Sequence, residues 1–263
     1  AQSFLGKAVG RVEKTELPKV AVGLVTKAGS VADAAGKSGQ ASMTARLMRR
    51  GTKSRNALQI DSTLGDLGTA LGGGASREFS SLGFEALTRN LDQAMGVMAD
   101  VALNPTFPAD EFEKDKKQIS DNLAQAANNP NAVANRVAAM IAMGKDHPYG
   151  RPSGGLPATI NAITRDDLVS FYQANWKPAS TAIVFVGDVT LADATAMARK
   201  HFGSWSGGAA PAVNVAAVQP MPTGKGYLID KPGAAQTVVS HILKAPERKS
   251  AAYYALTLAN AVK

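Results

Sequence analysis

The sequence GQASMTARLMRRGT, residues 39–52, is typical of a short helix between two glycines. Gly51 is the kind of residue that ends helices, so a helix is predicted from Gln40 to Arg50. The stretch before it, KVAVGLVTKAGS, alternates and is rich in valine, which predicts a strand over residues 19–28. This part of the chain is therefore expected to form a strand, a loop of small residues and a helix.

Similar patterns along the rest of the chain predict the fold class α/β (α+β). Helices are predicted over residues 55–67, 90–103, 109–127, 131–143, 164–176 and 191–202, and further strands over 69–74, 78–86 and 181–189. Prolines and asparagines in NPTFP and NNPN separate the middle helices. We expect a mainly antiparallel sheet with helices packed on one face.

The chain is predicted to divide near residue 215. Residues 206–224, SGGAAPAVNVAAVQPMPTG, are rich in Pro, Gly and Ala and carry no charge, which is the composition of a linker. Beyond it, residues 225–263 follow the same order of strand, polar loop and alanine-rich helix as the start of the chain. The prediction is a first domain over 1–205, a linker, and the beginning of a second similar domain.

Composition excludes several classes of function. There is no cysteine, so disulfides and thiolate metal sites are excluded, and no apolar run of about 18 residues exists to span a membrane. The formal net charge of +8 invites a nucleic-acid interpretation. Most basic residues alternate with acids, as in EFEKDKKQISD, which is typical of a solvated helix face. We therefore expect no nucleic-acid partner.

One interval is basic without any acid. Six cations, and neither carboxylates nor aromatic residues, lie between residues 34 and 60: Lys37, Arg46, Arg49, Arg50, Lys53 and Arg55. Missing aromatics argue against a base-stacking surface. Two interpretations stay open for the three arginines near the end of the helix. They face an acidic peptide or partner surface, or they extend along the helix toward solvent.

The predicted helix has no side chains suited to metal chemistry. Side chains four residues apart share a helix face, so an H-x-x-E-H helix can hold zinc with two histidines while its glutamate activates water. At the matching spacing this chain has Ser42, Ala45 and Arg46. Serine is a poor zinc ligand, alanine has no base, and arginine is a permanent cation. The sequence therefore predicts neither a catalytic residue nor a metal ligand here.

Other candidates for catalysis are weaker. No two of the histidines, His147, His201 and His241, lie within a helical turn of each other, and no G-x-S-x-G motif is present. The three glycines Gly72, Gly73 and Gly74 form either a loose turn or part of a strand. No G-K-[ST] follows them, so a phosphate-binding loop is not expected.

Six strings in order resemble the pitrilysin and insulinase-type zinc metallopeptidases, in particular the processing-peptidase branch. The strings are KVAVGLVTKAGSVAD, GQASMTARLMRRGTKSR, LGGGASREFSSLGFEAL, LNPTFPADEFEKDKKQI, HPYGRPSGG and VSFYQANWKPASTAIVFVGDVT. The resemblance covers about 245 residues. It implies a metallopeptidase-like half-domain followed by the start of a second one.

The resemblance also assigns positions. Ser42, Ala45 and Arg46 occupy the H-x-x-E-H motif, and the family's third ligand, a glutamate, falls on Asp121 or Asn122. Gly72 and Gly73, followed by Gly74, stand where the family binds extended substrate along an edge strand by main-chain hydrogen bonds. The resemblance thus implies a peptide-binding chain whose metal site is degenerate.

We therefore expect a catalytically inactive subunit that pairs with an active H-x-x-E-H zinc peptidase subunit and helps to hold peptide. Zinc is expected in that partner and no cofactor in this chain. Two alternatives are a stand-alone scaffold or assembly protein and a metal-dependent peptidase with unusual ligands. The N-terminal AQS agrees with a mature start after signal cleavage. This predicts a periplasmic or secreted location, with the cytoplasm as the alternative.

Overall fold

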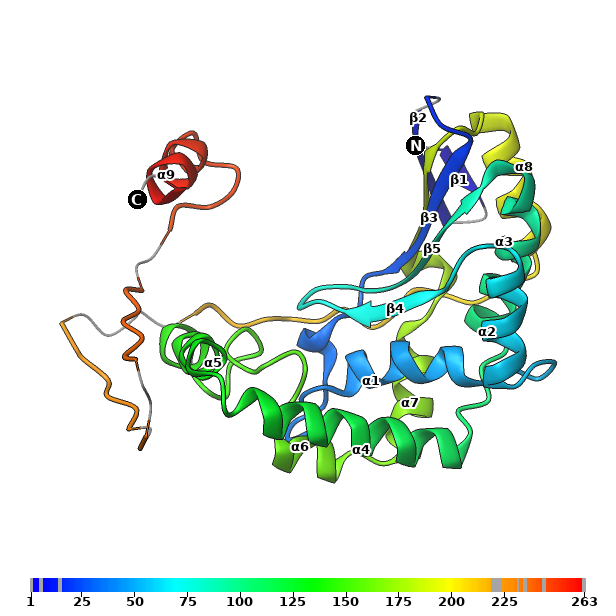
Figure 1. Ribbon diagram of the computed structural model, residues 1–263. Coiled ribbons are helices and arrows are strands. Elements are labelled where there is room, and N and C mark those ends of the chain that lie inside the picture. The colour runs from blue at the N-terminus through cyan, green and yellow to red at the C-terminus, as the bar shows by residue number, and fades with distance from the viewer. Residues whose placement is uncertain are drawn as a thin grey trace.

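The computed structural model describes residues 2–4, 7–13, 16–218, 224–230, 232–233, 236–242 and 245–261 (Figure 1). Its strands are β1 (Gln2–Phe4), β2 (Lys7–Glu13), β3 (Lys19–Thr26), β4 (Gly72–Ala75), β5 (Ser80–Leu87) and β6 (Thr181–Gly187). Its α-helices are α1 (Gln40–Leu47), α2 (Ala57–Asp66), α3 (Leu91–Leu103), α4 (Ala109–Ala126), α5 (Pro130–Met143), α6 (Pro157–Ala162), α7 (Arg165–Asn175), α8 (Leu191–Phe202) and α9 (Ala252–Ala261). Short 3-10 turns are η1 (Ser30–Ala32), η2 (Met48–Arg50), η3 (Thr88–Asn90) and η4 (Pro178–Ser180).

The strands form one six-stranded sheet in the order β1-β2-β6-β3-β5-β4. All neighbours are antiparallel except β2 and β6, so the predicted mainly antiparallel sheet is confirmed. Strand β3 lies in the middle and pairs with both β5 and β6 along its whole length. Strand β4 forms one edge, which leaves its outer side without a strand partner among the described residues.

Burial alternates along the central strands. Val20, Val22 and Leu24 of β3 are buried, whereas the residues between them are only half-buried, and β5 and β6 repeat this pattern. The buried face packs against α1, α3 and α8, which lie on the same side of the sheet (Figure 1). The prediction of helices on one face of the sheet is therefore confirmed. The apolar side chains lie between the sheet and these helices, because burial of apolar surface is the main contribution that favours folding.

Strands β1 and β2 and helix α6 were not predicted from the sequence. Strand β2 pairs in parallel with β6, far away along the chain, and KAVGRVE has no regular alternation to indicate it. Helix α6 has only six residues, too few for a periodic pattern. Both owe their structure to contacts distant in sequence, which local patterns do not report.

The C-terminal part differs from the prediction in one respect. Residues 206–218 contain no regular element, as expected of a linker, and α9 supplies the predicted last helix. However, the strand predicted after residue 225 is not formed in the described residues 224–230 and 236–242. A strand needs a neighbour for its N–H and C=O groups, and none of the described residues provides one there. The predicted domain boundary stays a prediction.

No described helix has both the length and the hydropathy needed to cross a membrane.

Candidate functional site

Helix α1 lies between the edge strand β4 and the helices α4 and α7 (Figure 1). Its start is fixed by Asp33, whose carboxylate accepts hydrogen bonds from the backbone N–H groups of Gly39 and Ala41, both at 2.8 Å. Negative charge at a helix N-terminus is favourable. Burial nevertheless dominates and raises the pKa of Asp33 to about 7, against the lowering effect of these hydrogen bonds.

The helix then continues as predicted, with a change of pitch. It is α-helical to Leu47, and Met48–Arg50 form a 3-10 turn before Gly51. The side chains at the expected motif positions differ in exposure. Ala45 is fully buried, while Ser42 and Arg46 are half-buried. Their spacing places the three residues on one face of α1, as expected.

Arg46 makes a two-pronged ion pair with Asp115 of α4. Its Nε lies 3.1 and 3.2 Å from the two carboxylate oxygens, and its Nη2 lies 2.5 Å from Oδ1. The side chain of Asp115 is only 7% exposed and that of Arg46 is 34% exposed. The hydrogen bonds to Asp115 raise the pKa of Arg46 further, so this site holds a permanent cation with its own counter-ion.

Asp115 was missed in the sequence, where it was grouped with the solvated carboxylates of EFEKDKKQISD. Its position three residues after Phe112 was the available signal, because Phe112 is buried and residues i and i+3 share a helix face. Other charged residues of that segment agree with the solvated interpretation, except Lys116, which is half-buried and donates to the carbonyl oxygens of Asn161 and Ile163. Lys114 pairs with Asp110 and Glu111 within the helix.

The two candidates for a third metal ligand lie apart from this pair. Asp121 and Asn122 are exposed on α4, where Asp121 accepts from Lys117 and Asn122 accepts from Gln118. No three His, Cys, Asp or Glu side chains within the described residues come together in a way that could hold a metal ion. Zinc catalysis uses three protein ligands. Serine, alanine and arginine at 42, 45 and 46 do not fit zinc.

The three glycines form strand β4, so the loose-turn alternative is wrong. Gly72, Gly73 and Gly74 pair with Gly83, Leu82 and Ser81 of β5. A Cβ on Gly73 would lie 2.6 Å from the carbonyl oxygen of Ala45, which no side chain tolerates. At Gly72 and Gly74 a Cβ would meet nothing closer than 3.5 Å. The middle glycine therefore allows β4 to approach the backbone of α1 closely.

Most of the basic interval turns out to be neutralised by carboxylates distant in sequence. Lys37 pairs with Asp167, Arg46 with Asp115, Arg50 with Asp61 and Glu111, and Arg55 with Asp100. The interpretation of Arg46 and Arg50 as free cations facing an acidic ligand is therefore wrong. Arg49 differs, because it makes no ion pair with any carboxylate of the described residues.

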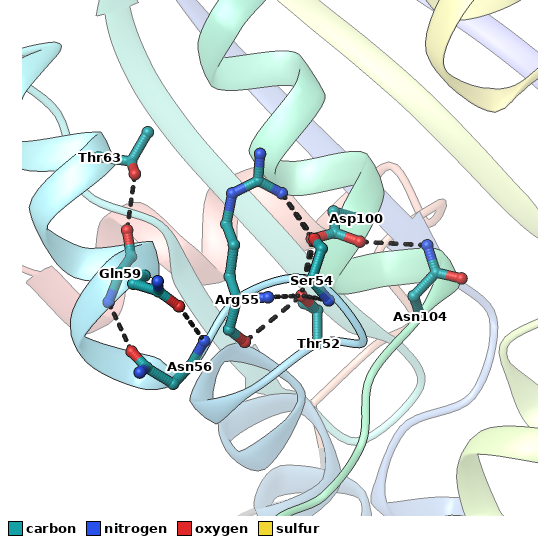
Figure 2. Close-up of polar contacts among 8 residues, drawn as sticks. All are labelled: Thr52, Ser54, Arg55, Asn56, Gln59, Thr63, Asp100 and Asn104. Atoms are coloured by element: carbon teal, nitrogen blue, oxygen red, sulfur yellow. Dashed lines mark hydrogen bonds and ion pairs between the residues drawn. The ribbon is translucent and has the colours of Figure 1, made fainter.

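The Gly-Thr that follows η2 has a structural role. Figure 2 shows the carboxylate of Asp100 in α3 surrounded by donors: Thr52 at 2.7 Å, Ser54 at 2.6 Å, Arg55 at 2.6 Å and Asn104 at 3.1 Å. These hydrogen bonds lower the pKa of Asp100 in spite of its burial. The network attaches the loop after α1 to α3.

Two of the histidines make polar contacts within the fold. His147 accepts from the N–H of Tyr149 and lies 2.9 Å from the carbonyl oxygen of Ala216. His201 lies 2.8 Å from Asp92. His241 lies in the described segment 236–242, which has no regular structure. These three histidines are not brought together.

Comparison with known proteins identifies the fold. A sequence model described as Insulinase (Peptidase family M16) matches residues 11–152, and one described as Peptidase M16 inactive domain matches residues 162–262. The chain belongs to peptidase family M16. The two matched ranges meet inside the first compact unit, because α7 and β6 lie after residue 162 and β6 pairs with β3.

Three relatives illustrate the range of the family. An uncharacterized zinc protease of Mycobacterium leprae is 28% identical over 197 residues, covering 74% of this chain and 44% of that protein. The mitochondrial-processing peptidase subunit beta of Mus musculus is 26% identical over 191 residues, covering 73% and 39%. The crystal structure of a peptidase M16 inactive domain from Pseudomonas fluorescens superposes with a TM-score of 0.76 and 27% identity, covering 83% and 53%. The chain thus spans less than half the length of the curated relatives that it matches.

Proposed function

We propose that this chain is a catalytically inactive family M16 subunit that binds extended peptide along β4 and works with a zinc-bearing H-x-x-E-H subunit. The observation that carries the proposal is the ion pair between Arg46 and Asp115 on the helix face where the family's motif would lie. A guanidinium cannot be deprotonated in proteins and accepts no metal.

Ala45 supports the same proposal. It stands where the motif would place its general base, and it is fully buried under the close approach of β4. A glutamate there would need space for about four more heavy atoms, and overpacking a buried site is destabilising. Alanine in place of glutamate at position 45 therefore removes the general base and also reduces the volume of the side chain.

Peptide binding is supported by the free edge of β4. An extended peptide can add to such an edge through main-chain hydrogen bonds, which need no particular side chain on the receiving strand. Strand β4 is short, and its glycines have no side chains to cover its backbone. Binding of this kind is compatible with a site that has no catalytic groups.

The proposal is tested by purifying the full-length protein alone and together with an H-x-x-E-H homologue encoded by the same organism. We expect no peptide cleavage by the single chain, cleavage by the pair that a chelator abolishes, and zinc in the partner only. Chelator-sensitive cleavage by the single chain, with about one zinc per chain, would instead support a peptidase with unusual ligands.

A stand-alone scaffold is the second candidate. Both candidate functions assume that α1 carries no catalytic groups. They differ in the protein that the chain is expected to bind. Co-purification from the native host discriminates the two: recovery of a zinc peptidase supports the first candidate, and recovery of other proteins without one supports the scaffold. The location, periplasmic or secreted with the cytoplasm as the alternative, stays a prediction that cell fractionation would test.

A further inference from the structure

Arg49 is the unusual member of the arginine cluster formed by Arg46, Arg49 and Arg50. Its Nη1 donates a hydrogen bond to the carbonyl oxygen of Leu71, the residue just before β4. Its Nε is buried and has no hydrogen-bond partner, and its Nη2 makes no hydrogen bond to any residue that the structure describes. A half-buried guanidinium with unused donors is costly unless something pairs with it.

The surroundings of Arg49 add to this cost. Burial lowers the pKa of Arg49, and the positive charges of Arg50 and Arg46 lower it further. Both of those neighbours have carboxylate partners of their own, at Asp115, Asp61 and Glu111. Asp61 and Asp115 act on Arg49 from a longer distance and raise its pKa, but no described carboxylate makes an ion pair with it, so its guanidinium can still pair with a carboxylate.

The position of Arg49 indicates where that charge comes from. A Cβ on Gly73 would lie 3.1 Å from Cδ of Arg49, so the arginine lies directly beneath the middle of β4 on the α1 side. A peptide strand added to the free edge would lie about 4.8 Å from β4, and alternate side chains would point to the α1 side. A side chain there lies within reach of a guanidinium.

We infer that Arg49 binds a carboxylate of the peptide held along β4, so the preferred ligands are acidic peptides. This inference rests on the proposed peptide-binding function and specifies its ligand class. A guanidinium N–H donates a charge-assisted hydrogen bond to a carboxylate, and the Nη2 of Arg49 makes none to any described residue, whereas its Nε is enclosed. An acidic side chain and a free peptide C-terminus offer the same chemistry.

The test measures binding and needs no catalysis. Fluorescence anisotropy compares three labelled extended peptides on the full-length chain: one with blocked ends and a central glutamate, its glutamine counterpart, and the glutamine peptide with a free C-terminus. We expect at least one carboxylate-bearing peptide to bind about tenfold more tightly than the blocked glutamine peptide, since about 1.4 kcal/mol corresponds to tenfold. Which of the two binds more tightly identifies the source of the carboxylate.

Two variants assign the effect to this residue. Arg49→Gln should reduce the preference to less than twofold, while Arg50→Gln, in the same turn but already paired, should retain it. If Arg49→Gln does not fold, Arg49→Lys keeps the charge without the fork and should show a reduced preference. Equal binding of all three peptides by the unaltered chain, or an unchanged preference in a folded Arg49 variant, would overturn the inference alone. Absence of all peptide binding would overturn the peptide-binding proposal with it.

Discussion

Replacing Arg46 by methionine should destabilise the chain, because it leaves Asp115 ionised and without its partner. Methionine keeps most of the apolar stem that arginine packs against α4, so the change mainly removes charge and hydrogen bonds. Breaking a fully buried ion pair from one side costs roughly 3–5 kcal/mol, and an exposed pair contributes about 0–1 kcal/mol. With Asp115 at 7% exposure and Arg46 at 34%, we expect a loss of about 2 kcal/mol.

Removing the other partner of the ion pair, Asp115, should lower the free energy of unfolding by less. In Asp115→Asn the remaining arginine is one-third exposed and can turn its guanidinium toward water, so about 1 kcal/mol is expected. Combining Arg46→Met with Asp115→Leu should recover most of the loss, since a well-packed apolar pair often replaces a buried ion pair without penalty. The two positions are therefore predicted to be strongly non-additive.

Thermal unfolding followed by circular dichroism measures these differences. For a unit of about 200 residues, 1 kcal/mol shifts Tm by roughly 2–4 °C, so Arg46→Met should lower Tm by about 4–8 °C. Arg50→Met is the matched control, because its ion pairs are long and partly exposed, and it should shift Tm by no more than about 2 °C. Equal shifts for the two methionine variants, or a further loss in the combined variant, would refute the view that the Arg46–Asp115 pair joins α1 to α4.

Three further predictions concern the same region. Gly73→Ala should abolish peptide binding or lower Tm by several degrees, because it places a Cβ against a backbone carbonyl. Gly74→Ala places its Cβ in open space and should be close to neutral. Fluorescence anisotropy and thermal unfolding of both variants measure these effects. Because burial raises the folded-state pKa of Asp33 to about 7 from an ordinary value of 3.8, its stabilising contribution is complete below pH 4 and decreases toward pH 7. The difference in unfolding free energy, Asp33→Asn minus the unaltered chain, should thus rise by up to about 4 kcal/mol between pH 4 and pH 7. A difference that does not change with pH would contradict this prediction. Restoring H-x-x-E-H at residues 42–46 should give no peptide cleavage, as a peptidase assay would show, because position 45 is fully buried and has no space for a glutamate side chain.

The elements that carry the site could be predicted because their signals are local. The alternation of residues 19–28 and the glycine after Arg50 predicted β3 and the end of the helical segment to within two residues. The degenerate motif on α1 was located by the resemblance of the surrounding strings to the metallopeptidase family. Periodicity and end signals depend on neighbours in the chain, which a single sequence contains.

What could not be predicted depends on contacts between distant parts of the chain. The carboxylates that neutralise the basic interval come from α2, α3, α4 and α7, so a stretch without any acid in the sequence is largely neutral in the fold. The partner of Arg46 lies 69 residues away. Charge patterning along a sequence reports only helical neighbours, and therefore overestimated how many of these cations are free.

The close contact between β4 and α1 links the absence of catalytic groups to the geometry of the peptide edge. Ala45 is fully buried, and its carbonyl oxygen leaves no space for a Cβ on Gly73. A side chain at position 73 would push the strand away from the helix, so the present position of the edge requires glycine there. Strand β4 also receives the hydrogen bond of Arg49 at its start. The edge strand therefore lies directly above Arg49, which makes no ion pair with any described carboxylate, so a peptide bound along β4 as proposed would have this arginine as its nearest cation of the cluster.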